Sequence, residues 1–405
     1  MSHGYKQTDV GMIPEEWEER SVASVCKLIN GRGFKPHEWK RSGLPIIRIQ
    51  NLNGSEEFNY FEGPYAKKLE VENGQLLFAW SGSRGTSFGP HIWNGPLGLL
   101  NYHTWKVQVD ECAISKDFFL HALKKLTKFI EDRAHGASAL VHTQKWEMEG
   151  FKFPVPPTPI EQRTIANALN DVDALLNALD RLIAKKRDLK QATMQQLLTG
   201  QVRLPGFRGE WARAVLGNLL TMRATYGIVT AGNFKSTGVP MVRGGDIKKG
   251  QIGNDLPFIS QEKSSEYSRT ILKIGDVLIA LVGYPGEAAK VPARLEGANI
   301  SRAVGLLRLN KLIAPDYLVS YLNSPMGRRM VIAPSAGSAQ QVVNLAALNK
   351  LEFLLPPPSE QIAIADILTD MDIELVTLMQ QREKTHALKQ GMMQELLTGK
   401  TRLIP

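Results

Sequence analysis

The chain has 405 residues, of which 43% are hydrophobic and 22% charged. This composition excludes a disordered chain and suits a globular protein of two or three domains. Cys26 and Cys112 form no Cys-x-x-Cys pair, so neither a disulfide framework nor a structural zinc site is expected. Apolar runs stay below the roughly 18 residues of a membrane span, and residues 1–10 do not resemble a signal peptide, which favours a cytoplasmic protein without a membrane partner.

Residues 1–155 form the first predicted domain, which we call the first module. Short β-branched runs are interrupted there by Gly and Pro, a pattern typical of a small domain rich in strands. One helix is expected from Asp117 to Asp132. The topology of the strands does not follow from the pattern.

Residues 156–205 form the first predicted spacer region. A proline cluster precedes it, and proline neither donates to a strand ladder nor fits inside a helix. Apolar residues then recur at spacings of three and four, which predicts a coiled-coil helix of about 40 residues and ~60 Å. The pattern stutters near Lys186, resumes through Leu189 and Leu197, and ends before Gly200, which suits a left-handed helix cap. The predicted seam consists of Ile165, Leu169, Val172, Leu176, Leu179 and Ile183.

Residues 206–355, the second module, resemble the first loosely. Trp17 and Trp211 open the two modules, and the segment 43–51 is similar to 238–246. A helix is expected from Pro315 to Val331. The same kinds of strand and turn signals predict a second small mixed domain.

Residues 356–405, the second spacer region, repeat the first. Residues 161–204 align with 360–403 at a constant offset of 199 positions, and 21 of the 44 positions are identical. An internal repeat of this kind fixes the organisation of a fold. The pattern stutters near Arg382, resumes through Leu388 and Leu396 and ends at Gly399; Gly391 within it costs about 1 kcal/mol relative to Ala. The predicted seam consists of Ile364, Leu368, Met371, Leu375 and Leu378.

Together these elements predict an α+β fold. Two small strand-rich mixed α/β domains are expected to be separated by two long antiparallel coiled-coil helices. The first helix then leads from one module to the other and the second leads back, which makes the chain nearly cyclic with a pseudo-twofold axis. Such an axis suits two half-sites on DNA.

The net charge of +9 favours an anionic partner, and it is unevenly distributed. Residues 206–355 carry +8, residues 1–155 carry +1, and the two spacer regions together are neutral. Basic residues lie beside Gly, Asn, Gln, Ser and Tyr in predicted loops, a mixture that can hold phosphates and contact base edges. The candidate DNA-binding residues are Arg32, Lys35, Arg48, Gln50, Asn51, Ser83, Arg84, Arg243, Asp246, Lys248, Lys249 and Tyr284. For any one of them a solvated surface position is an alternative.

Motifs for catalysis are missing from the sequence. Gly399-Lys400-Thr401 resembles the end of a phosphate-binding loop, but Gln394 stands at the position of its first glycine, so a helix cap is expected. No metal-binding His-Glu-x-x-His pair is present. The repeated acidic pairs, Asp171 with Asp173 and Asp370 with Asp372, are expected at a surface or an interface. We predict no catalytic residue and no metal site.

The complete chain resembles the specificity subunit of type I restriction-modification systems. The resemblance rests on a Glu-Gln pair followed by Ile-Ala and Leu after each proline cluster, on Leu-Leu-Thr-Gly helix ends, and on the junction at 204–211. The opening Ile-Pro-Glu-Glu-Trp at 13–17 is also similar to the start of that family. The weakly basic first module departs from the pattern.

This resemblance implies a non-catalytic subunit whose two target-recognition domains each recognise half of a bipartite, asymmetric site in double-stranded DNA. The helices would set the spacing and dock two modification (methyltransferase) subunits. Restriction subunits, which translocate and cut DNA, would complete the complex. S-adenosylmethionine, ATP and Mg would be bound by these partners, and no cofactor by this chain.

Two alternatives from other functional classes stay open at the level of sequence. A stand-alone nuclease or methyltransferase would act on DNA without partners, which the missing motifs disfavour. A pure scaffold would bring other proteins together, and would be insensitive to neutralisation of Arg84, Arg243, Lys248 and Lys249.

Overall fold

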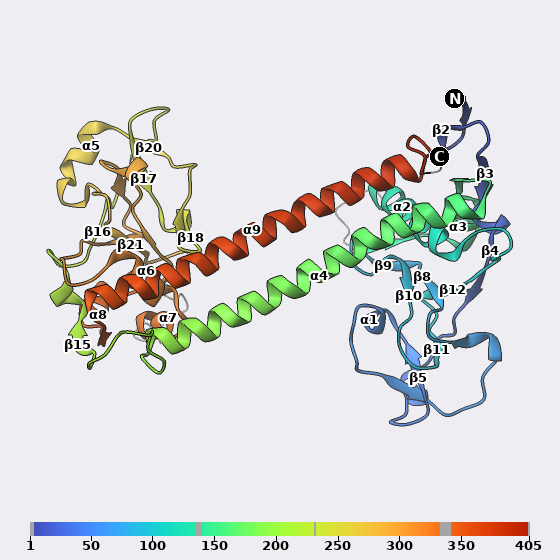
Figure 1. The fold of residues 1–405 in the computed structure, drawn as a ribbon, viewed down its shortest axis with the longest axis horizontal. Helices are drawn as coiled ribbons and strands as arrows, with labels where there is room; N and C mark the ends of the chain where they lie inside the picture. The colour runs from blue at the N-terminus through green and yellow to red at the C-terminus, as the bar shows by residue number, and fades with distance from the viewer. Residues whose placement is uncertain (1–3, 134–139, 231, 333–341, 404–405) are drawn as a thin grey trace. The chain divides into compact units, whose positions relative to one another are not determined.

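The computed structural model describes residues 4–133, 140–230, 232–332 and 342–403. The chain folds into two compact units: Met1–Leu179 with Gln381–Pro405, and Asp180–Gln380. Each unit contains one module and about half of each long helix (Figure 1). Among the helices of the described ranges, none combines the length and the hydropathy that a membrane span requires.

The first module is built mainly from strands, as the alternation of β-branched runs with Gly and Pro predicts. Its strands are β1 (Tyr5–Thr8), β2 (Gly11–Pro14), β3 (Glu18–Ser21), β4 (Cys26–Asn30), β5 (Leu44–Ile47), β6 (Asn59–Phe61), β7 (Glu70–Val71), β8 (Leu76–Ala79), β9 (Ser81–Ser83), β10 (Gly89–Ile92), β11 (Gly98–Leu100), β12 (Thr104–Val109), β13 (Leu140–His142) and β14 (Lys152–Val155). Its α-helices are α1 (Ile49–Leu52), α2 (Lys116–Arg133) and α3 (Lys145–Gly150).

The second module has the same kind of composition. Its strands are β15 (Ala212–Val215), β16 (Thr225–Tyr226), β17 (Val239–Val242), β18 (Ile247–Lys248), β19 (Gln251–Ile252), β20 (Phe258–Ile259), β21 (Val277–Ala280), β22 (Ala288–Lys290), β23 (Asn299–Ile300), β24 (Val304–Leu307) and β25 (Glu352–Leu355). Its α-helices are α5 (Gln261–Glu266), α6 (Pro315–Asn323), α7 (Pro325–Ile332) and α8 (Leu345–Asn349).

The two modules share one strand topology, which could not be derived from the sequence. An antiparallel sheet has the order β10-β8-β12-β4 in the first module and β22-β21-β24-β16 in the second. A further sheet has the order β6-β5-β11-β7 and corresponds to β20-β17-β23; the equivalent pairs β5-β11 and β17-β23 are both parallel. The pairs β14-β3 and β15-β25 close each module beside its long helix. The loose sequence similarity between the modules therefore reflects a common fold.

A repeated close approach of two backbones explains one glycine in each module. A Cβ atom on Gly31 would lie 2.0 Å from the carbonyl oxygen of Asn101, and one on Gly227 would lie 1.9 Å from that of Ile300. The residues that follow, Arg32 and Ile228, each form an isolated parallel bridge to the opposite segment. Glycine is the residue that lets two backbones come this close.

The helix expected from Asp117 to Asp132 is confirmed as α2. The helix expected from Pro315 to Val331 is interrupted, because α6 ends at Asn323 and α7 begins at Pro325. Ser324 between them has an extended backbone (φ −68°, ψ 155°), the conformation that a following proline favours. The apolar pattern continues across this break, which is why periodicity alone missed it.

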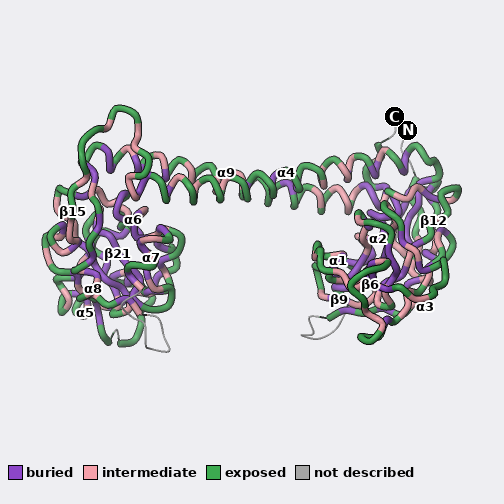
Figure 2. Tube along the Cα trace, turned by 90° about the horizontal axis from the view of Figure 1, so that it is seen from below, coloured by how far each residue is buried: buried purple, intermediate pink, exposed green. Residues whose placement is uncertain are grey.

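The two long helices are confirmed as α4 (Pro159–Leu198) and α9 (Pro358–Leu396). Their outer ends join the cores of the modules: Ile165 and Leu169 pack with Leu396 in the first unit, and Ile364 and Leu368 with Leu197 in the second. Between these ends most of the helical surface is exposed (Figure 2).

The predicted seam is correct in its first part. After the stutter the prediction is wrong at Leu189 and Leu388 but confirmed at Leu197 and Leu396, which are buried. Leu176, Leu179 and Ile183 are buried, but Leu189 and Leu388 are 49% and 59% exposed. Beyond the stutter the seam passes one position later, through Lys190 and Lys389. The Lys190 and Lys389 side chains are only 20% and 17% exposed, and their ammonium groups reach acidic partners on the other helix.

Ion pairs inside each unit show that the two helices run antiparallel. In the first unit Lys389 of α9 pairs with Asp173 of α4. In the second unit Lys190 of α4 pairs with Asp372 of α9. Lys389 is the repeat equivalent of Lys190, and Asp372 is that of Asp173. Each helix therefore supplies the lysine to one of these ion pairs and the aspartate to the other, as expected for antiparallel helices. Asp173 and Asp372 thus have the interface role that the sequence predicts.

The beginning and the end of the described chain meet in the first unit, as the cyclic arrangement predicts. The Tyr5 hydroxyl donates to the carbonyl oxygen of Gly399 at 3.3 Å. The Arg402 guanidinium donates to the Glu16 carboxylate at 2.8 Å. Gly399 itself has a φ of 72°, so the helix cap expected there is confirmed.

Candidate nucleic-acid interface

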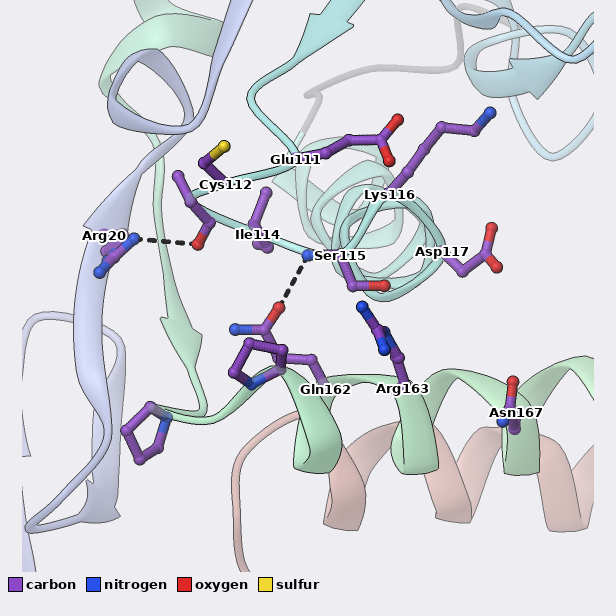
Figure 3. Close-up of a pocket in the computed structure, with 13 residues that line it drawn as sticks. Arg20, Glu111, Cys112, Ile114, Ser115, Lys116, Asp117, Gln162, Arg163 and Asn167 are labelled. Atoms are coloured by element: carbon purple, nitrogen blue, oxygen red, sulfur yellow. Dashed lines mark hydrogen bonds between the residues drawn. The ribbon is translucent and has the colours of Figure 1, made fainter.

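The Glu-Gln pair that opens each long helix anchors the helix to its module. In the first unit, the Gln162 side chain accepts from the backbone N–H of Ser115 at 2.8 Å and donates to the carbonyl oxygen of Pro156 at 3.0 Å. The Gln361 side chain contacts Ala314 and Pro356 in the same way. Figure 3 shows Gln162 pointing toward Ser115, with Arg20 bonded to the loop before α2. These residues line a hollow at the start of α4, and we assign their hydrogen bonds a structural role.

The glutamate of each pair is fully buried and binds an arginine from the other copy of the repeat. Glu161 receives hydrogen bonds from Arg402, and Glu360 receives them from Arg203. We call each of these pairs a latch. A buried carboxylate without a charged partner is destabilising, so the glutamate and the arginine are needed together. The Glu-Gln pair therefore has a structural role, which is to fix each module to its long helix.

In the second module, several predicted residues gather around one hollow of the surface. Arg243, Asp246 and Lys248 line it. The Lys248 ammonium lies 4.9 Å from the centre of the Tyr284 ring, so Tyr284 joins this group. Sequence reasoning missed Lys290 and Arg294, which line the same hollow but come from β22 and the turn after it.

The strand β17 positions Arg243, which follows its last residue. Val242 is fully buried and pairs with Ile300 of β23, so the backbone that carries Arg243 is fixed by the sheet. The Asp246 carboxylate accepts from the Arg243 backbone N–H at 2.8 Å and from its guanidinium at 2.9 and 3.0 Å. The hydrogen bonds to Asp246, opposed in part by burial, raise the pKa of Arg243 above its ordinary value.

Lys249 occupies the turn between β18 and β19. Its φ of 51° is unusual for a residue with a side chain, and its backbone N–H donates to the Glu287 carboxylate at 2.9 Å. The Lys249 side chain is exposed beside that of Lys248 in the chain. A paired lysine tip of this kind suits phosphate binding.

In the first module, two of the three predicted arginines, Arg32 and Arg48, lie against aromatic rings. The Arg32 guanidinium lies 4.9 Å from the Phe34 ring centre and 4.8 Å from that of Phe61, and it pairs with Glu38. The Lys35 backbone N–H donates to the same Glu38 carboxylate, while the Lys35 residue is exposed.

Arg48 follows β5 as Arg243 follows β17. It lies 5.1 Å from the Trp39 ring centre and donates to Asn59 at 2.8 Å. Asn51 is 7% exposed, and its amide is bonded within the loop to Arg48, Ser55 and Glu57. Asn51 therefore supports the loop in this structure.

The remaining candidates of the first module lie on other elements. Gln50 is exposed in α1 and donates to the carbonyl oxygen of Glu57 at 3.2 Å. Ser83 ends β9, which pairs with β13, and Arg84 is exposed in the turn that follows. The structure therefore does not place Ser83 on the sheet that carries Arg48.

A cluster of aromatic residues in the first module was missed by the sequence reasoning. The Trp80 ring lies 6.4 Å from that of Tyr102 and 5.3 Å from that of His103. Tyr102 is 47% exposed. Its turn corresponds to Ser301–Ala303 in the second module, so the equivalent position there is Arg302. The two modules thus present different chemistry on one fold.

The two modules share one topology but carry different side chains on their equivalent loops, and a pair of long helices joins them. These features define a class of tandem-repeat protein that presents two different recognition surfaces. The chain belongs to the family described as the type I restriction modification DNA specificity domain, whose pattern matches residues 14–187 and again 209–386. The resemblance found in the sequence is therefore confirmed, and so is the fold class that it implies.

Individual relatives agree with this assignment. The chain is 27% identical to the type I restriction enzyme EcoBI specificity subunit of Escherichia coli, over 86% of this chain and 78% of that protein. It is 23% identical to the type I restriction enzyme MjaVIII specificity subunit of Methanocaldococcus jannaschii, over 96% and 94%. The fold is similar to the S subunit of a type I restriction-modification system from M. genitalium, with a TM-score of 0.59 and 15% identity, over 98% and 99% of the chains.

Proposed function

We propose that this chain is the DNA-recognition subunit of a type I restriction-modification complex, and that each module recognises one half of a bipartite site. The main support for the proposal is that the two modules share one fold but carry different residues on their equivalent loops. Equivalent loops present Arg243 with Asp246 in one module and Arg48 with Asn51 in the other. Since phosphate contacts are common to all sequences, such differences at the loops suit two different half-sites.

The uneven charge supports different modes of binding by the two modules. The second module, at +8, supplies most of the attraction to phosphates. The first module, at +1, offers aromatic and arginine groups such as Trp80, Tyr102 and Arg48. Apolar contacts with thymine methyl groups and hydrogen bonds to base edges need little net charge.

Catalysis and cofactors belong to the partners in this proposal. Two modification subunits would dock on the helical region and methylate adenine with S-adenosylmethionine, and restriction subunits would use ATP and Mg to translocate and cut DNA. A cytoplasmic location is part of this proposal, because the complex would need access to double-stranded DNA inside the cell. The predicted seam and interface residues then act through geometry: α4 and α9 set the spacing between half-sites.

The test is a genome-wide map of methylated adenine in cells that express this chain with its neighbouring methyltransferase, compared with cells that lack the chain. We expect a split motif that occurs only with the chain. The purified complex should also prefer that motif over scrambled DNA in a competition gel shift. Equal competition by every sequence would contradict the proposal.

A separate experiment tests the spacing role of the helices. Inserting one heptad at matched positions in α4 and in α9 should lengthen the unspecified spacer in the methylation motif. Insertion in α4 alone is the control, because it should disturb the paired helices without defining a new spacing. If the double insertion leaves an active complex with an unchanged spacer, the helices do not set it.

A further inference from the structure

Arg243 and Asp246 form a fork of charge-assisted hydrogen bonds at the edge of the second module. The Arg243 Nε and Nη2 atoms donate to the two oxygens of the Asp246 carboxylate at 3.0 and 2.9 Å. A guanidinium has five N–H donors, so an outer edge with two roughly parallel donors remains. The Arg243 side chain is 47% exposed, whereas that of Asp246 is only 11% exposed. The arginine therefore presents its outer edge to solvent while the aspartate stays beneath it.

The loop that carries this fork is held by close packing. A Cβ atom on Gly244 would lie 2.3 Å from the carbonyl oxygen of Val282, so the loop backbone lies directly against its neighbour. Asp246 also accepts from the Arg243 backbone N–H. The same carboxylate thus fixes both ends of the arginine, which reduces the entropy that the side chain loses when it binds.

The charge of the fork distinguishes a base contact from a phosphate contact. Asp246 neutralises Arg243 at hydrogen-bond distance, and Asp255 is near enough to raise the pKa of Arg243 further. A phosphate placed against Arg243 itself would meet these carboxylates as well, which weakens the attraction at this position, while Lys248, Lys290 and Arg294 supply the positive charge elsewhere in the hollow. A base edge carries no net charge, so the carboxylates oppose its binding less than that of a phosphate. Two parallel donors match the O6 and N7 acceptors of guanine.

We propose that Arg243 recognises a guanine in the half-site of the second module, and that Asp246 is the positioning residue that aims it. This inference rests on the proposed function and adds a base identity to it. The equivalent arginine of the first module is arranged differently, because Asn51 replaces the aspartate and Arg48 turns to Asn59 and Trp39. The fork is therefore a property of one half-site.

The experiment maps adenine methylation by the complete complex with Arg243→Ala, Arg243→Lys and Asp246→Asn. The matched control is Glu266→Gln, which removes the acidic partner of another i,i+3 pair in the same module, Lys263–Glu266. With the wild-type chain we expect one invariant G·C pair in the affected half-site. Arg243→Ala should reduce discrimination at that pair by about tenfold or more and leave the other positions intact.

The two conservative variants separate a base contact from the alternatives. Arg243→Lys keeps the charge but loses the two-donor edge, so it should lose the same base preference while the rest of the motif stays. Asp246→Asn should weaken the preference at that position only. Glu266→Gln should leave the motif unchanged.

Several results would overturn this inference while leaving the proposed function standing. One is an intact motif with uniformly weaker methylation in Arg243→Ala and normal behaviour in Arg243→Lys, which indicates a phosphate contact. Another is tighter binding to all sequences in Asp246→Asn. By contrast, a wild-type complex without any sequence preference would overturn the proposed function itself.

Discussion

Arg402 and Glu161 lie 241 positions apart in the sequence, yet the Arg402 Nη2 atom is 2.9 Å from the Glu161 Oε2 atom. Arg203 and Glu360 make the same contact in the other unit, with 2.7 Å between Nη2 and Oε2. In both units a tryptophan, Trp17 or Trp211, lies against the arginine. The glutamate and the arginine of the latch are identical in the two copies of the repeat, and we expect both to contribute to stability.

We expect Arg402→Ala to destabilise the first unit by about 3 kcal/mol, because it leaves the fully buried Glu161 carboxylate without its charged partner. Lys128→Ala is the control, since Lys128 forms an exposed pair with Asp132 and should change stability by less than about 1 kcal/mol. Urea unfolding followed by circular dichroism measures both. Equal midpoints for the two variants would contradict the role of the latch.

Lys125 in α2 gives a prediction about pH. Burial, aided by the nearby charge of Lys400, lowers the pKa of Lys125 to about 8. The unfolded chain therefore holds this proton up to higher pH than the folded chain does, so the contribution of Lys125 to stability improves as pH rises from about 8 to 10.5. At pH 7 the cost of burying the charge is present in full.

Lys125→Met should consequently stabilise the protein at pH 7, by up to about 3 kcal/mol, and the advantage should shrink toward pH 10.5. Thermal unfolding of the variant and the wild type across this range measures the difference. Lys128→Met serves as the exposed control and should show no such trend. A constant difference at all pH values would argue against the titration of Lys125.

Gly31 and Gly33 offer a matched pair for substitution. Gly31→Ala places a Cβ atom 2.0 Å from a carbonyl oxygen, whereas at Gly33 the nearest neighbouring atom is 3.9 Å away. We expect Gly31→Ala to cost about 1–3 kcal/mol through the forced backbone shift, and Gly33→Ala to be nearly neutral. Denaturant unfolding measures both. The close approach would be unimportant if the two variants behaved alike.

Ile183 and Leu189 test the corrected seam of α4. Ile183 is 4% exposed and Leu189 is 49% exposed. Ile183→Ala should cost about 2–4 kcal/mol, while Leu189→Ala should stay within about 0.5 kcal/mol. Thermal unfolding of the two variants ranks them. A larger loss of stability for Leu189→Ala than for Ile183→Ala would mean that Leu189 lies in the buried seam, as its apolar spacing predicts.

We expect Lys248 to contact a phosphate of the DNA in the proposed interface. For Lys248→Ala in the complete complex, DNA affinity should fall by a similar factor on every sequence, and the dependence of log affinity on log salt should become shallower by about one. Lys311→Ala, an exposed lysine of the same module, is the control. Loss of preference at a single base pair would instead make Lys248 a base contact.

The sequence predicts the long elements well because their signals repeat. The apolar spacing of α4 and α9 extends over many turns, and the second copy supports the first. The exposure of Leu189 and Leu388 is missed because the neighbouring Lys190 and Lys389 pair with acidic residues on the other helix, which a pattern of apolar residues does not register. The break at Ser324 is missed for a related reason, since the apolar pattern continues through it.

The candidate interface is less predictable because it depends on spatial proximity. Residue types in loops point to Arg243, Asp246 and Lys248, and these do line one hollow. Lys290 and Arg294 line the same hollow although they come from a strand and a turn much later in the sequence. No motif around either residue indicates this position. The exposed ring of Tyr102 likewise gains its setting from Trp80, which lies 22 positions away in the chain.

Each latch takes its glutamate from one copy of the repeat and its arginine from the other. A chain cut after residue 205 would give two halves, each holding one buried acid whose natural partner lies on the other piece. Either half alone could satisfy that acid by exchanging segments with a second molecule like itself. The tandem chain thus keeps within one molecule two contacts that separate halves could restore only by pairing with another molecule.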